Sequence, residues 1–195
     1  SKCFALPLAL VRITRVFAGG LVSATVAVAL SGCVGAPAVS VYGDLVDLCF
    51  TTQTVPETSV EGYLSYVGIT LVNTAPHEVI LREARPLTLV NSYVSDISIV
   101  VTDSEYHTFG IAPGGKLTPE QRPLWNARTD IDGVRIAGGG SAELIVQLHA
   151  RDFTRYSGIE GMHVKYDDGW FSATSSADTV VGFVAPWSHC GSGRR

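Results

Sequence analysis

Apolar and polar residues alternate one by one through much of this chain, and this period limits what it can fold into. In the segment 94–101, for example, Ile97, Ile99 and Val101 alternate with Asp96 and Ser98. A period of two is typical of a half-buried β-strand. Comparable patterns predict strands at 45–50, 63–72, 78–89, 134–136, 142–150, 162–166, 170–173 and 179–184. No long helical period follows residue 44, so we expect an all-β fold, an immunoglobulin-like β-sandwich of about eight strands.

Local signals refine this prediction at two places. Pro86 cannot donate a hydrogen bond to a neighbouring strand, so the strand 78–89 is expected at a sheet edge or with a bulge at that residue. The run Asp167-Asp168-Gly169 is typical of a hairpin turn in which glycine adopts a positive φ.

The segment before the predicted sandwich has the pattern of an export signal. Residues 16–30 are uncharged and largely apolar, and Arg12 and Arg15 precede them. The run ends in Leu30-Ser31-Gly32-Cys33, which looks like a bacterial lipobox, in which the cysteine receives a diacylglyceryl group and becomes the first residue. The fifteen apolar residues are short for a membrane span, which needs about 20. An uncleaved amino-terminal anchor is the alternative, supported by a further apolar stretch at 4–11.

This interpretation divides the chain into four parts. Residues 1–32 are the expected signal peptide, and 33–44 are the lipidated Cys33 with a flexible tether. The β-sandwich domain is expected over 45–190, followed by a flexible tail at 191–195. The covalent lipid on Cys33 would place the domain at the outer face of the bacterial cytoplasmic membrane, with the membrane itself as a partner.

The charge of the expected mature chain argues against a nucleic-acid partner. All 18 acidic residues follow Cys33, whereas three of the 14 basic residues (Lys2, Arg12 and Arg15) precede it, which leaves a formal net charge of about −7. A surface that binds phosphates needs a basic stripe, and the sequence has none.

The four cysteines fit an exported protein. Cys3 would leave with the signal peptide and Cys33 would carry the lipid, so Cys49 and Cys190 are left to form a disulfide bond. A metal site made of these two thiolates is the alternative, but it lacks the close spacing of such sites.

No catalytic motif stands out. The sequence lacks a Gly-x-Ser-x-Gly elbow, a His-Glu-x-x-His zinc motif and a phosphate-binding loop. We therefore predict neither an enzyme nor a cofactor site. A hydrolase without a recognisable motif stays as one alternative, and a copper carrier is another, with His149, Met162 and His163 on late strands as its candidate ligands.

A long connection offers the first candidate for a binding surface. Residues 102–133 show no sustained period and contain three prolines and a glycine pair, and long loops in compact domains are often functional. Tyr106 and Trp125 lie in this connection and are expected to be more exposed than the aromatic residues in the predicted strands. A crossover between two sheets, with Trp125 packed over the edge of the core, is the alternative.

The order of these features resembles that of small bacterial envelope lipoproteins with an immunoglobulin-like domain. The resemblance is carried by Leu71-Val72-Asn73-Thr74 at a strand end, by a glycine-serine step into Leu144-Ile145-Val146-Gln147-Leu148, and by Val164-Lys165-Tyr166. These lipoproteins have no assigned function, so the resemblance implies the fold and carries over no functional residue. In the absence of a catalytic motif, we expect a binding or assembly module in the cell envelope, with an envelope protein or a cell-wall polymer as its partner.

Overall fold

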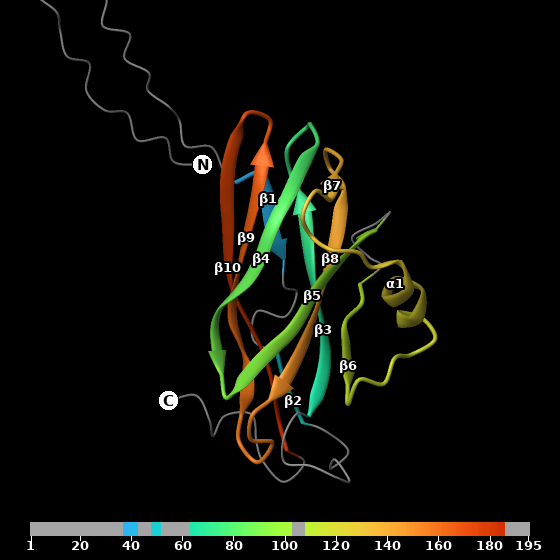
Figure 1. The fold of residues 1–195 in the computed structure, drawn as a ribbon, viewed down its shortest axis with the longest axis vertical. Coiled ribbons are helices and arrows are strands. Elements are labelled where there is room, and N and C mark those ends of the chain that lie inside the picture. The colour runs from blue at the N-terminus through green and yellow to red at the C-terminus, as the bar shows by residue number, and fades with distance from the viewer. Residues whose placement is uncertain (1–36, 43–47, 52–62, 103–107, 186–195) are drawn as a thin grey trace, which may run out of the picture. The chain divides into compact units, whose positions relative to one another are not determined.

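The computed structural model describes residues 37–42, 48–51, 63–102 and 108–185. All of them belong to one compact unit that starts at Pro37. Strands dominate it and form two sheets packed face to face (Figure 1).

Each sheet holds five strands. The first sheet has the order β1 (Val39–Tyr42), β3 (Leu64–Asn73), β8 (Ser141–Ala150) and β5 (Ser92–Thr102), with β6 (Ile111–Pro113) also paired to β3. The second has the order β2 (Leu48–Thr51), β10 (Phe171–Val184), β9 (Ser157–Asp168), β4 (Val79–Val90) and β7 (Arg135–Ile136). Among these pairs only β2 and β10 run parallel.

The strand order confirms the predicted all-β sandwich. Strands β1, β3, β8 and β5 follow the order A-B-E-D of an immunoglobulin domain, and β10, β9 and β4 follow G-F-C in the opposite sheet. Strand β1 pairs with the first sheet and β2 with the second, so the beginning of the domain contributes to both sheets.

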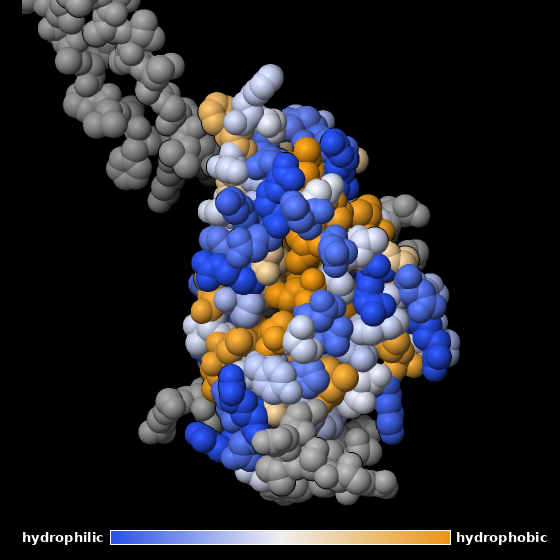
Figure 2. Space-filling model, in the orientation of Figure 1, coloured by the Kyte–Doolittle hydropathy of each residue, from blue (hydrophilic) through white to orange (hydrophobic). Residues whose placement is uncertain are grey.

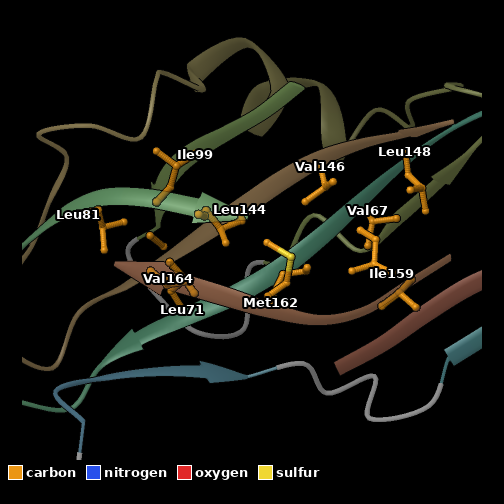
Figure 3. Packing of buried hydrophobic residues seen from close by; sticks show 14 of the residues in the cluster. Val67, Leu71, Leu81, Ile99, Leu144, Val146, Leu148, Ile159, Met162 and Val164 are labelled. Carbon is orange, nitrogen blue, oxygen red and sulfur yellow. The ribbon is translucent and has the colours of Figure 1, made fainter. Parts of the chain in front are cut away.

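The core lies between the two sheets and uses the alternation seen in the sequence. Leu144, Val146 and Leu148 of β8 are fully buried and face Met162 and Val164 of β9 (Figure 3). Alternate side chains of β8 thus enter the core between the sheets, and such burial of apolar surface is the dominant favourable contribution to folding.

Strand β4 lies at an edge for most of its length, as Pro86 predicts. Strand β7 pairs with it at Val79 and Ile80, and Leu81 exchanges backbone hydrogen bonds with Gly133 and Val134. Among the described residues, the rest of β4 pairs with β9 alone. The register also shifts between Leu81 and Glu83, and such a bulge interrupts an edge that another chain could extend.

Apolar side chains reach the surface along the open side of the sandwich. Figure 2 shows an apolar strip on the face where β4 and β5 diverge from their connecting turn in Figure 1. Leu87 and Leu89 of β4 are among the exposed large apolar residues. Within the described ranges, no helix has the length and hydropathy of a membrane span.

The expected flexible tether is wrong in its second half. Val39–Tyr42 forms β1 and pairs antiparallel with β3, with Val39 opposite Asn73 and Tyr42 opposite Thr70. The Val39 side chain is fully buried. The segment forms a strand despite its small side chains, because the longer strand β3 supplies the hydrogen bonds and Val39 is buried in the core.

The long connection contains more regular structure than its sequence suggests. It holds β6, the helix α1 (Gln121–Ala127) and an isolated bridge between Thr129 and Ile99 of β5. It then passes to the second sheet, where Leu81 donates its N–H to the carbonyl of Val134. The connection is therefore a crossover between the sheets, which was the alternative interpretation.

Candidate functional site

Several predicted site residues lie outside the described residues. Cys33, Cys190 and Tyr106 are in this group, so the lipid attachment and half of the predicted surface stay predictions. Cys49 is described, lies on β2 and is disulfide-bonded. Its pairing with Cys190 also stays a prediction.

The candidate copper ligands are not brought together. His149 belongs to β8 of the first sheet, where its ring stacks on Tyr93 at 4.7 Å between centroids and contacts the hydroxyl of Ser95 at 2.8 Å. His163 belongs to β9 of the second sheet, and the neighbouring Met162 points into the core (Figure 3). In the part of the chain that the structure describes, no three His, Cys, Asp or Glu residues group closely enough to hold a metal ion.

Trp125 is half-buried and takes part in packing. Its ring lies 4.3 Å from that of Tyr66 between centroids, and the guanidinium of Arg128 lies 3.6 Å from the centre of the Trp125 ring. With Phe109 and Leu124 it belongs to a second apolar cluster on the outer face of the first sheet. Its main contacts are therefore internal to the domain.

The helix that carries Trp125 is fixed by a capping box that the sequence reading missed. Thr118 donates its N–H to Oε1 of Gln121 at 2.9 Å, and its hydroxyl accepts from the Gln121 N–H at 3.3 Å. The signal is the string Thr118-Pro119-Glu120-Gln121, with threonine and glutamine three residues apart and proline after the threonine.

The same glutamine ties α1 to the segment around β6. Nε2 of Gln121 donates to the carbonyl of Phe109 at 2.7 Å and to that of Ile111 at 3.1 Å. The bond to Phe109 is buried, so it satisfies a carbonyl group away from bulk water.

Glu143 is a buried carboxylate beneath this cover. Its Oε2 accepts from the Thr70 hydroxyl at 2.8 Å and its Oε1 from the N–H of Phe109 at 3.1 Å, and only 2% of its surface is exposed. The strand pattern at 142–150 places Glu143 on the polar face, which alone suggests solvent exposure. Among the described residues, Phe109 in the segment before β6 lies against it, and a contact between segments so far apart in the sequence has no local sequence signal.

The exposed aromatic surface lies at the turn between β9 and β10. Trp170 is 98% exposed and Phe171 76% exposed, against the expectation that Trp125 would be the more accessible. Phe171 pairs with Asp168, so Gly169 and Trp170 form a two-residue loop, and Gly169 has the positive φ of 62° expected at the first position of a type II′ turn. We call Trp170 and Phe171 the aromatic tip.

Ionic contacts hold the base of the aromatic tip. Asp167 accepts from the Ser172 hydroxyl at 2.7 Å and from Nε of Arg82 at 2.7 Å, and Arg82 also donates to Asp132 at 3.1 Å. The hydrogen bond from Ser172, followed by that from Arg82, lowers the pKa of Asp167. In turn, Asp167 and then Asp132 raise the pKa of Arg82. Asp168 pairs with the ring of His77.

A buried asparagine fixes the loops beside the aromatic tip. Nδ2 of Asn73 donates to the carbonyl oxygens of His77 at 2.7 Å, Ile136 at 3.0 Å and Ala137 at 3.0 Å. Its Oδ1 accepts from the N–H of Ala75 at 3.0 Å. The loop that carries His77 is therefore held in place, and through the His77–Asp168 pair it supports the hairpin.

Comparison with known proteins adds no assignment. Neither the protein-family models nor the curated proteins include a match to this chain. The aromatic tip is accordingly the candidate site on geometric grounds alone, as an exposed aromatic pair on a rigid frame.

Proposed function

We propose that this chain is a lipid-anchored module of a bacterial cell envelope that acts by binding and not by catalysis. A diacylglyceryl group on Cys33 holds it at the outer face of the cytoplasmic membrane. The sandwich then presents its surface to an envelope protein or to a cell-wall polymer.

One observation carries this proposal: the lipobox-like Leu30-Ser31-Gly32-Cys33 at the end of an uncharged, largely apolar run. Its position relative to the fold is consistent with an anchor, because the compact unit starts at Pro37, directly after the motif. The disulfide bond of Cys49 is also typical of proteins that fold outside the reducing cytosol.

The two alternative functions lack a specific observation in their favour. A copper carrier would need His149, Met162 and His163 to converge, whereas they occupy two sheets and the core. A hydrolase would need a nucleophile or a carboxylate pair beside a base in an accessible site, and no such arrangement has been assigned in the described residues.

Replacement of Cys33 tests the anchor. We expect Cys33→Ser to release the protein from washed membranes, while the matched control Cys3→Ser fractionates like the parent, since Cys3 lies in the segment that is removed. Crosslinking in cells, followed by mass spectrometry, would then identify partners that depend on the anchor. Membrane association of Cys33→Ser as firm as that of the parent would contradict the proposal.

A further inference from the structure

We propose that the aromatic tip is a second membrane contact, in which Trp170 and Phe171 insert into the headgroup layer of the bilayer that holds the lipid on Cys33. This inference rests on the proposed lipid anchor. It adds a defined orientation, with the long axis of the sandwich upright on the membrane.

The strand register places the beginning of the domain and the aromatic tip at the same end. Val39 pairs with Asn73 at the end of β3. The Asn73 side chain donates to the carbonyl of Ile136, and Ile136 pairs with Val79 at the start of β4. These residues of both sheets are therefore at one level along the strand direction.

Strand β9 ends at this same level. Ile80 pairs with Asp167, so the preceding Val79 is level with Asp168, and Trp170 lies two residues further out. Pro37 likewise lies two residues before Val39. Figure 1 shows the start of β1 and the turn between β9 and β10 at one end of the sandwich.

The length of the connection keeps this end close to the lipid. Cys33 and Pro37 are four residues apart, and four residues span at most about 14 Å even when fully extended. A diacylglyceryl group on Cys33 would place that residue at the membrane surface, since its acyl chains lie in the hydrocarbon core. Pro37 would then lie within this short distance of the bilayer, and we infer that the end of the sandwich shared by Pro37 and Trp170 faces it.

The chemistry of the aromatic tip suits the interface. Tryptophan is enriched where the hydrocarbon meets the headgroups, because its ring is apolar and its N–H needs a polar partner. Among the other described aromatic rings, Tyr166, Phe109 and Phe183 are fully buried, and Tyr93 is 39% exposed. The Trp170 ring is 98% exposed, so it contributes almost no buried apolar area to the stability of the domain. In a headgroup layer, part of this apolar surface would be removed from water.

The charges around the tip favour a neutral lipid surface. The carboxylates of Asp167 and Asp168 next to the aromatic pair are bound by Arg82 and His77. The more distant Glu78 pairs with Arg135, and Asp132 pairs with Arg82 as well. These groups comprise four carboxylates and two guanidinium groups, so they are net acidic, and we expect contact through the aromatic side chains and not through attraction to anionic lipid.

Depth-dependent quenching tests this inference on the full, lipidated chain. The protein would be reconstituted into phosphatidylcholine vesicles that carry bromine atoms at shallow or deep acyl positions. The difference between the parent and Trp170→Ser isolates the emission of Trp170, and replacement of so exposed a side chain leaves the fold intact. We expect this emission to shift to shorter wavelength and to lose most of its intensity with shallow bromines, and less with deep ones.

A tryptophan at the opposite end is the matched control. Tyr93 lies near the start of β5, far from the tip, and is partly exposed. Tyr93→Trp in the Trp170→Ser background should show no quenching, because β9 with its 12 residues separates the two ends by roughly 40 Å.

The outcomes separate this inference from the proposed anchor. If the mass of the amino-terminal peptide shows lipid on Cys33 but Trp170 is not quenched, the membrane contact is refuted and the anchor stands. If Cys33 carries no lipid and the chain does not float with vesicles, both are refuted. A blue shift of Trp170 that depends on protein concentration and not on lipid would overturn the membrane contact in favour of self-association.

Discussion

Thr70 on β3 donates its hydroxyl to the carboxylate of Glu143 on the neighbouring β8, at 2.8 Å, on the outer face of the first sheet. The other carboxylate oxygen accepts from the N–H of Phe109 in the excursion that covers this face. Glu143 therefore connects the sheet to its cover and is a structural residue in the described contacts.

Replacement of Glu143 should destabilise the sandwich. Glu143→Ala leaves the buried N–H of Phe109 without this acceptor, and we expect a loss of about 1–3 kcal/mol in the free energy of unfolding by urea. The exposed Glu83 on β4 provides the control, since Glu83→Ala should change stability by less than about 0.5 kcal/mol. Equal effects of the two replacements would show that Glu143 does not hold the cover.

Gln121→Ala should loosen α1 without unfolding the sandwich. The change removes the capping box with Thr118 and two hydrogen bonds to the segment around β6, so we expect a loss of about 1–3 kcal/mol. Emission of Trp125 should shift to longer wavelength as it becomes more exposed. The neighbouring, exposed Arg122 provides the control, and a comparable spectral change in Arg122→Ala would contradict this account.

Ser172→Ala should raise the pKa of Asp167. The Ser172 hydroxyl is the main cause of the lowered pKa, and Arg82 is the next. A folded-state pKa below the unfolded value of about 3.9 means that these bonds stabilise the fold at neutral pH, and that this contribution is lost as the pH falls through the folded-state pKa. Titration of the Asp167 side-chain carbon by NMR measures the shift directly, and an unchanged pKa in Ser172→Ala would refute the assignment.

The predicted disulfide pair can be tested by single and double replacement. If Cys49 pairs with Cys190, then Cys49→Ser, Cys190→Ser and the double variant should lose the same stability, about 4–5 kcal/mol in the chain-entropy model for so long a loop. A peptide map without reduction should contain one linked peptide with both residues. A linkage of Cys49 to another cysteine would refute the pairing.

The strands were predictable because their signal is local. Alternation around Ile97 and Ile99, and around Leu144 and Val146, assigns faces without knowledge of the partner strands. The turn at Gly169 was predictable for the same reason, since a positive φ favours glycine. In contrast, the strand β1 depends on hydrogen bonds to β3, and no local pattern within Val39–Tyr42 predicts these bonds.

The candidate site was harder to predict because exposure depends on what covers a residue. Trp125 in the long connection is half-buried, and it packs against Tyr66 and Arg128. Tyr66 is distant in the sequence and Arg128 is three residues away, and no motif predicts either contact. Trp170 lies between two long strands, yet it falls in the two-residue turn that follows Asp168 and its side chain is exposed.

The mass of the amino-terminal peptide from purified membranes tests the central claim most directly. The account predicts that the mature chain begins with Cys33 and that this residue carries the added mass of a diacylglyceryl group. A membrane-derived chain that retains residues 1–32, or one in which Cys33 is an unmodified thiol, would contradict it.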